Sequence, residues 1–198
     1  MSLKKNKSRH NQVQRKLMDE GLRLIACQGL HGCKVEDITN AADVGKGTFF
    51  NYFGSKDNFV AKLIEYCLAD LARRLSPLAA SPPLAEPLLT SLGGVYLRYF
   101  QLRPEVAALI IQSISLPQDS EAGQQIKNSL QRHLELVSQI LQPIGQELGW
   151  GGNLRELALS LLSLSCGFFW MNQGMDSPPG SLLDRLSKVL ARGLSRTV

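Results

Sequence analysis

The stretch VGKGTFFNYFGSKDNF (44–59) combines lysines, glycines, hydroxyl and amide side chains and aromatic rings. Such residues could cradle a phosphate in a glycine-rich loop, or present hydrogen-bond donors to a nucleic-acid groove. The phosphate-loop pattern G-x-x-x-x-G-K-[ST] fails, because Lys46 is followed by Gly47 and position 40 is Asn. The pattern G-x-G-x-x-G also fails, since Phe50 stands where its last glycine would be. The sequence therefore does not favour a nucleotide-binding loop here.

A helix that begins at Gly45 would sort these residues onto two faces. Phe49 and Phe53 are four residues apart and share one face, which we expect to pack against the core. The other face would carry Lys46, Gly47, Phe50 and Asn51, flanked by Thr48 and Tyr52. Ammonium, hydroxyl and amide groups contact phosphates and base edges, and an aromatic ring suits thymine methyl groups. We therefore predict that this outward face reads a groove of DNA.

Helical signals recur along the chain, whereas strand signals are nearly absent. Apolar spacing and capping residues predict an N-terminal helix from Val13 to about Gly29, short helices at 35–42 and 45–52, and a longer helix from Ser55 to Leu75. The two short helices are joined by a tight turn at Asp43 and Val44. This arrangement predicts a helix-turn-helix.

The second part of the chain begins at the segment SPLAASPPLAEP (76–87), whose four prolines are expected to end the preceding helix and mark a boundary. Further helices are predicted at 84–101, from Pro104, along Ile126–Leu141, at 154–173 and from Ser181, with a glycine-rich loop at 145–152. The predicted fold is all-α, with about nine helices. Residues 1–54 would form a basic arm and a three-helix DNA-binding domain, 55–75 a connecting helix, and 76–198 a larger helical bundle.

Positive charge is concentrated at the N-terminal end. Residues 1–62 hold 11 basic and 6 acidic side chains, whereas the remainder is balanced. This asymmetry favours an anionic partner, although a solvated basic tail is the alternative. Four scattered cysteines, no C-x-x-C pair and no signal peptide favour a reducing, cytoplasmic setting. The uncharged stretch 157–175 contains several polar residues, so we expect a buried helix and no membrane partner.

The segment VEDITNAADVGKGTFFNYFGSKDNF (35–59) resembles the DNA-binding signature of the TetR family of bacterial transcriptional regulators. The matching residues are Ile38, Ala42, Val44, Gly47, Thr48, Phe49, Phe50, Tyr52, Phe53, Ser55, Lys56 and Phe59. The resemblance implies that Lys46, Thr48, Phe50 and Asn51 face the major groove and that Tyr52 and Lys56 bind phosphate. Two departures are Asp43, where the turn usually has Gly, and Gly45, where the helix usually has a Ser N-cap. Asp43 in a left-handed conformation would cost about 1 kcal/mol.

The resemblance further implies that the C-terminal bundle dimerises and encloses a ligand pocket. The last two helices are the dimer candidates, through the small residues Ser160, Ser163 and Gly167 and the leucines at 183, 186, 190 and 194. The alternative is that these faces pack within one chain. Candidate ligand contacts are Tyr96, Phe100, His133, Phe168 and Trp170, with the alternative that they are ordinary core residues.

Three functions follow as hypotheses. The favoured one is a sequence-specific transcriptional regulator, a homodimeric repressor that binds a palindromic operator in double-stranded DNA and is released by a small, largely apolar or aromatic effector. The second is a DNA-binding regulator without such an effector, controlled by a protein partner or by cysteine oxidation. The third is a helical-bundle enzyme. It is disfavoured because the sequence offers three histidines and no recognisable nucleophile–base pair or metal set. We therefore predict no catalysis and no cofactor.

Overall fold

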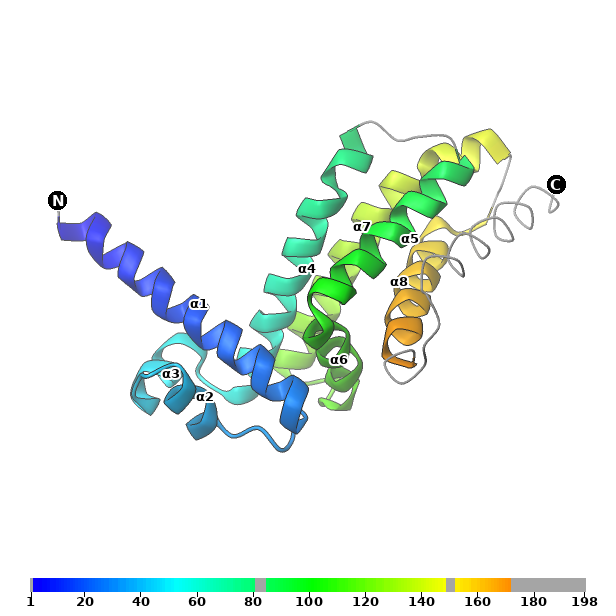
Figure 1. Cartoon of the computed structure of the whole chain (residues 1–198). Coiled ribbons are helices and arrows are strands. Elements are labelled where there is room, and N and C mark those ends of the chain that lie inside the picture. Colours follow the sequence, from blue (N-terminus) through cyan, green and yellow to red (C-terminus); the bar gives the residue numbers. More distant parts are fainter. Residues whose placement is uncertain (1, 81–84, 149–151, 172–198) are drawn as a thin grey trace. The chain divides into compact units, whose positions relative to one another are not determined.

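The chain folds into helices. The computed structural model describes residues 2–80, 85–148 and 152–171 (Figure 1). Within these residues there are eight α-helices, one short 3-10 helix and no strand: α1 (Ser2–Gln28), α2 (Val35–Ala41), α3 (Lys46–Phe53), α4 (Lys56–Ala80), α5 (Ala85–Leu102), α6 (Pro104–Gln112), η1 (Ser113–Ser115), α7 (Glu121–Leu148) and α8 (Leu154–Met171). The predicted all-α fold with an N-terminal helix-turn-helix is confirmed. The helix expected from Ser181 lies outside the described residues.

The chain divides into two compact units. The first, here called the HTH unit, contains the residues up to Tyr66 together with Ala108–Lys127. The second, here called the bundle unit, contains Cys67–Ala107 and the described residues from Asn128 onward. Three helices, α4, α6 and α7, each begin in one unit and end in the other. The HTH unit therefore includes a segment that lies far along the sequence from the helix-turn-helix itself.

Aromatic rings fill the core of the HTH unit. Phe49 and Phe53 of α3 and Phe59 of α4 are buried, and their ring centroids lie between 4.8 and 5.1 Å apart. The expectation that the apolar face of α3 packs inward is confirmed. A Cβ added at Gly21 of α1 would lie 2.3 Å from Cζ of Phe59, so this position requires glycine for α1 to approach the ring.

Local chemistry sets the ends of the short helices. Gly29 follows α1 with φ of +77°, and its N–H donates to the carbonyl of Ile25 at 2.9 Å, which closes that helix. Asp43 has φ of +54°, so it adopts the left-handed conformation whose cost was considered for this turn. Gly45 is the N-cap of α3, and the Oγ of Ser55 accepts the N–H of Asn58 at the start of α4.

The bundle unit is built on α5, α7 and α8 together with the C-terminal part of α4. Helix α5 packs against α8, and Figure 1 shows α7 beside α5. The core is apolar and includes Leu88, Leu92, Leu97, Val137, Leu141, Ala158 and Leu162. The hydroxyl of Tyr99 in α5 donates to the carbonyl of Cys67 in α4 at 3.0 Å, which links these two helices.

Helix α8 covers most of the uncharged stretch noted in the sequence. It buries Leu157, Ala158, Leu161 and Leu162 and leaves the opposite side exposed. Among the helices of the described residues, none combines the length and the apolar character needed to cross a membrane.

Three predicted helix boundaries were wrong. Helix α1 begins at Ser2, not at Val13, so the basic N-terminal segment continues the helix. Helix α4 continues through Pro77 to Ala80, although the proline-rich segment was expected to end it. Proline removes a backbone N–H that would donate to the carbonyl four residues earlier, here that of Arg73. The hydroxyl of Ser76 donates to this carbonyl at 2.7 Å, which replaces the missing hydrogen bond.

The glycine-rich loop expected from Gly145 also begins later. Helix α7 continues through Pro143 and Gly145 to Leu148. A single glycine inside a helix costs only about 1 kcal/mol relative to alanine, which the long apolar face of α7 can offset.

Candidate nucleic-acid interface

Helix α3 has one buried and one exposed face. Phe49 is fully buried, whereas its neighbour Phe50 is 47% exposed. Lys46, Gly47 and Asn51 are also exposed, and Thr48 and Tyr52 are partly exposed on the flanks. A Cβ added at Gly45 or Gly47 would meet no atom within 4 Å, so the N-terminal backbone of α3 lies open. The exposed face therefore presents an ammonium group, an amide, a large ring and accessible backbone to any partner.

Lys46 is not free on this surface. Its Nζ forms a hydrogen bond and ion pair with Oε1 of Glu36, which lies in the first turn of α2. The hydrogen bond from Lys46 lowers the pKa of the Glu36 carboxyl below its ordinary value. Both side chains are about half exposed. A phosphate that binds Lys46 must therefore compete with a neighbouring carboxylate.

Two further predicted DNA contacts donate to backbone carbonyls in this structure. The hydroxyl of Tyr52 donates to the carbonyl of His10 in α1 at 3.0 Å, and the two rings lie 4.4 Å apart. The Nζ of Lys56 donates to the carbonyl of Leu30 at 2.6 Å. A lysine ammonium has three donors, so this bond leaves Lys56 able to bind a second acceptor. These contacts fix both side chains against the scaffold beside α3.

The loop between α1 and α2 is held from both sides. While Lys56 binds the carbonyl of Leu30, the side-chain oxygen of Gln112 accepts the N–H of the same residue at 2.5 Å. His31 lies next in the loop, and its Nε2 is 3.1 Å from the hydroxyl oxygen of Ser115. Gln112 and Ser115 belong to the 108–127 segment of the HTH unit. The sequence carried no signal for either residue, because a single side-chain bond to a distant loop leaves no periodic pattern.

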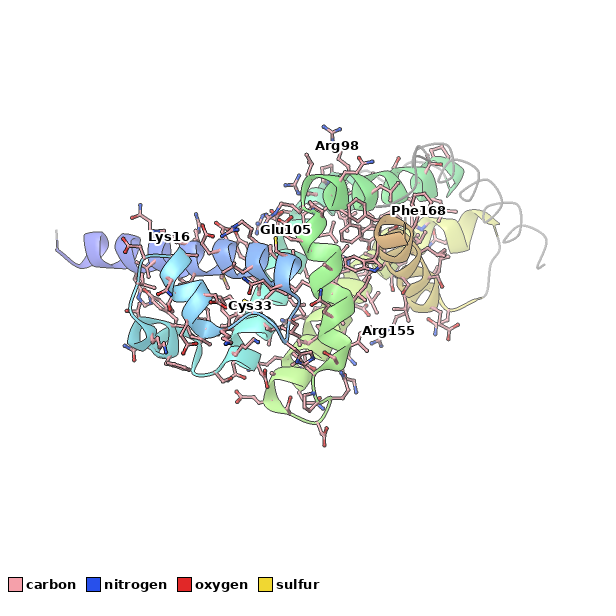
Figure 2. All side chains as sticks on the ribbon, turned by 60° about the horizontal axis from the view of Figure 1, so that its bottom comes forward. Lys16, Cys33, Arg98, Glu105, Arg155 and Phe168 are labelled. Carbon is pink, nitrogen blue, oxygen red and sulfur yellow. The ribbon has the colours of Figure 1, made fainter. Side chains whose placement is uncertain are left out.

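Exposed basic side chains continue along α1. Arg15 and Lys16 are exposed, and Figure 2 shows Lys16 projecting from the helix. Cys33 lies among the packed side chains of the HTH unit in the same view, and burial raises the pKa of its thiol.

In the bundle unit, the structure brings together three of the five predicted ligand contacts. Tyr96, Phe100 and His133 are all buried. The hydroxyl of Tyr96 is 2.9 Å from Nε2 of His133, and the ring of Phe100 lies 6.5 Å from that of Tyr96. Phe169 adjoins Phe100 at 6.2 Å. These residues come from α5, α7 and α8.

The other two predicted contacts are not part of this cluster. Phe168 is partly exposed on α8 (Figure 2), and Trp170 is 43% exposed. Among the described residues, neither ring forms an aromatic pair with Tyr96 or His133.

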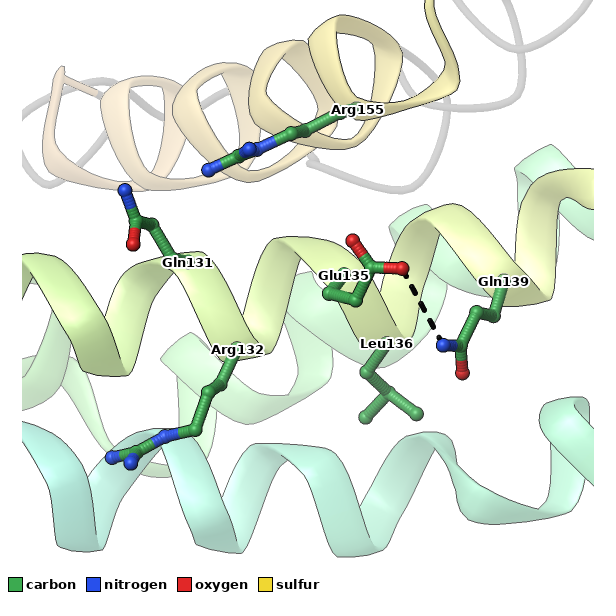
Figure 3. Close-up of a pocket in the computed structure, with 6 residues that line it drawn as sticks. All are labelled: Gln131, Arg132, Glu135, Leu136, Gln139 and Arg155. Carbon is green, nitrogen blue, oxygen red and sulfur yellow. Dashed lines mark hydrogen bonds between the residues drawn. The ribbon is translucent and has the colours of Figure 1, made fainter.

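An open groove also crosses the bundle unit (Figure 3). It has a volume of about 450 Å³ and is lined by Gln131, Arg132, Glu135, Leu136, Gln139 and Arg155. The amide of Gln139 donates to Glu135 at 3.5 Å, and Arg155 extends from α8 toward Gln131. Its lining is polar and largely exposed, unlike the apolar pocket that the sequence predicted.

Comparison with known proteins bears directly on the helix-turn-helix. The family described as "Bacterial regulatory proteins, tetR family" matches residues 17–63, from the middle of α1 into α4. The chain carries a TetR-family domain. The resemblance proposed from the sequence is thereby confirmed.

A curated relative points the same way. An HTH-type transcriptional repressor, DhaR of Mycobacterium sp. (strain GP1), is 36% identical over 75 residues, which is 36% of this chain. The match spans only 38% of that protein, well under two thirds of its length.

Solved structures resemble the whole chain in fold. Regulator FadR of Bacillus subtilis, in complex with stearoyl-CoA, is similar with a TM-score of 0.73 at 19% identity, covering 93% of this chain and 98% of that one. The fatty acid degradation regulator FadR of Bacillus halodurans gives 0.76 at 19% identity and coverage of 92% and 96%. The TetR-family regulator PfmR of Thermus thermophilus gives 0.70 at 20% identity and coverage of 91% and 100%. At these identities the likeness shows a shared fold.

Proposed function

We propose that this protein is a homodimeric transcriptional repressor that binds a palindromic DNA operator and is released from it by a small, largely apolar or aromatic effector. The observation that carries the proposal is the two-faced α3, whose rings at 49 and 53 are buried while Lys46, Phe50 and Asn51 face solvent. A large ring exposed beside an amide and an ammonium group has no role in the core of the free chain. It suits contacts with base edges and methyl groups in a major groove.

The surroundings of α3 support the same function. Tyr52 and Lys56 would add phosphate contacts at its edge, Gly47 would let the backbone approach the DNA closely, and Thr48 would reach the groove beside Lys46. The first N–H groups of a helix have no partner within it and favour a phosphate. The exposed basic side chains of α1 would extend the positive surface. An operator on the chromosome implies a cytoplasmic protein, and this function requires no catalytic group.

The exposed face of α8 supports dimerisation. Leu159, Leu164 and Trp170 are large apolar residues that are more than two-fifths exposed. Ser160, Ser163 and Gly167 lie on the same side of the helix, and a Cβ added at Gly167 would meet no atom within 4 Å. A face of small residues edged by apolar ones allows a second helix to approach closely. The second half of the proposed interface, the helix from Ser181, lies outside the described residues.

The buried cluster in the bundle unit supports an effector site. Tyr96, Phe100 and His133 meet between three helices, and Phe169 extends the apolar wall toward solvent. A protein of similar fold, FadR of Bacillus subtilis, was solved with stearoyl-CoA bound, which is consistent with a ligand-responsive bundle here.

Selecting the duplexes that the protein binds from a random pool tests the proposal. The selected sequence should be a palindrome. Fluorescence anisotropy should show that the affinity for this duplex falls by roughly 10³ or more between 50 and 200 mM salt. Phe50→Ala or Asn51→Ala should cost about 1–3 kcal/mol on the selected site and little on random DNA. Asn128→Ala, an exposed asparagine of α7, is the matched control and should change neither. Equal affinity for selected and random duplexes would contradict the proposal.

A further inference from the structure

The buried pair of Tyr96 and His133 is incompletely hydrogen-bonded. Tyr96 is 0% and His133 3% exposed, and the Tyr96 hydroxyl lies 2.9 Å from Nε2 of the imidazole. The other ring nitrogen, Nδ1, is buried and has no hydrogen-bond partner among the described residues. Buried polar atoms are nearly always paired, and one left unpaired destabilises the fold. The exception therefore calls for a partner that the described residues do not supply.

The hydrogen-bond partners of this pair indicate which nitrogen of the His133 ring carries the proton. Within the described residues, the Tyr96 hydroxyl bonds only to His133. If Nε2 carried the proton and donated it to Tyr96, the buried hydroxyl proton and Nδ1 would both be unpaired. If Tyr96 donates to Nε2, only one group is unpaired, the N–H at Nδ1. The second arrangement leaves a single buried donor that needs an acceptor.

The surroundings determine what kind of acceptor fits. Burial lowers the pKa of His133 to about 4, with no charged group contributing, so the ring is neutral at pH 7. Burial also raises the pKa of Cys166 to about 12 and that of Tyr96 above its ordinary value, so these neighbours are neutral too. A carboxylate placed here would be a buried charge without a cation to pair with it. A neutral carbonyl oxygen would satisfy the donor without that penalty.

We propose that Nδ1–H of His133, oriented by Tyr96, donates a hydrogen bond to the carbonyl oxygen of a neutral, largely apolar effector. Phe100 and Phe169, whose rings lie 6.2 Å apart, would contact its apolar frame. Phe169 is only partly buried, so the cluster reaches solvent on the α8 side. This inference rests on the proposed function, since it names the effector class for the bundle unit.

Two probes with the same frame test the carbonyl. Benzylacetone carries a ketone, and butylbenzene is the corresponding hydrocarbon. Calorimetry on the full chain should give benzylacetone an affinity about tenfold higher or more, which is the value of one newly satisfied buried hydrogen bond. The double variant Tyr96→Phe/His133→Phe removes both polar groups together and so avoids an orphaned partner. In this variant the two probes should bind equally, whereas His31→Gln, at an exposed histidine of the HTH unit, should keep the preference.

Nitrogen NMR of histidine-labelled protein gives a readout that needs no variant. His133 should be a neutral ring with its proton on Nδ1, and benzylacetone should shift that proton resonance strongly downfield while butylbenzene should not. A proton found on Nε2, no preference for the ketone, no binding of benzylacetone up to its solubility limit, or a preference that survives in the double variant would each overturn the inference.

Operator binding separates this inference from the function on which it rests. If the protein selects a palindrome but shows no ketone preference, the effector assignment fails and the repressor function stands. If it binds no specific DNA but holds benzylacetone through His133, the function fails and the ligand site stands.

Discussion

At the scale of single residues, the surface proposed to bind DNA contains a carboxylate that competes with phosphate for Lys46. Glu36 of α2 pairs with Lys46 of α3, so the first lysine of the proposed reading face is neutralised in the free protein. A carboxylate close to a phosphate also repels it. Residue 36 should therefore set how strongly the surface holds DNA of any sequence.

Replacing Glu36 with glutamine tests this view. Glu36→Gln keeps the size of the side chain, frees Lys46 and removes one negative charge. We expect affinity for operator and random duplexes to rise by about twofold to fivefold, the range of an exposed ion pair. Glu121→Gln, at an exposed carboxylate in the first turn of α7, is the control and should leave affinity unchanged. Weaker binding by Glu36→Gln would mean that the pair positions Lys46 for DNA.

His133 gives a second residue-scale expectation, for stability against pH. Its pKa is about 4 when folded and about 6.5 in an unfolded chain. Below pH 6.5 the unfolded chain therefore binds a proton that the folded protein does not. Stability should fall as the pH drops from 6.5 to 4, by about 3 kcal/mol from this group.

Urea unfolding at pH 7 and pH 4 measures the contribution of His133 to the pH dependence of stability. Between these two pH values, the unfolding free energy of Tyr96→Phe/His133→Phe should fall by about 3 kcal/mol less than that of the wild type, because the variant has no buried imidazole. His31→Gln should lose as much as the wild type. Equal losses in all three proteins would show that His133 is protonated as readily in the folded state as in the unfolded chain.

At the scale of elements, the position of α1 depends on a residue without a side chain. Gly21→Ala would place a Cβ 2.3 Å from the ring of Phe59, which is fully buried. Such overpacking should lower the unfolding free energy by about 1–3 kcal/mol. Gly94→Ala in α5 is the matched control, because an added Cβ there meets no atom within 4 Å, and it should stabilise by about 0.5–1 kcal/mol. Chemical denaturation gives the unfolding free energy of both variants. An unchanged unfolding free energy in Gly21→Ala would mean that Phe59 can move to make room.

The loop between α1 and α2 depends on a distant helix end. Gln112→Ala would leave the N–H of Leu30 without its acceptor, at a cost of about 1–3 kcal/mol in unfolding free energy. Since this loop leads into the helix-turn-helix, affinity for operator and random DNA should fall together. Gln131→Ala, at an exposed glutamine of α7, should change neither quantity. Unchanged stability in Gln112→Ala would show that water replaces the side chain.

The helices also show which structural features could be predicted from the sequence and which could not. Apolar spacing and caps predicted the short helices and the buried rings of α3, because both depend on local chemistry. The extension of α4 past Pro77 was missed, since it depends on one hydroxyl bond to a freed carbonyl. The anchoring role of Gln112 was missed because its partner is 82 residues away. In the bundle, the family resemblance made Tyr96 and His133 candidate ligand contacts, but their hydrogen bond required the structure.

At the scale of the whole molecule, a single HTH unit is insufficient for the proposed function. Two recognition helices must lie about 34–36 Å apart to enter successive major grooves on one face of B-DNA. Linking the two sites makes the second binding event intramolecular and can raise affinity by roughly 10²–10⁴. Specific affinity should therefore depend on the α8 face that we propose as the dimer interface.

A charge placed on the exposed face of α8 tests whether operator affinity depends on dimerisation through this face. Ser163→Arg puts a guanidinium among Leu159, Leu164 and Gly167, where a dimer would bury it without a partner. Sedimentation should show a monomer, and affinity for the palindrome should fall on the order of a hundredfold, because avidity is lost. Binding to random DNA should change by less than about threefold, since the phosphate contacts of each HTH unit remain. Gln139→Arg adds the same charge in the open groove of α7 and should leave a dimer with full affinity. A Ser163→Arg protein that stays dimeric and keeps its operator affinity would show that the chain pairs through another surface.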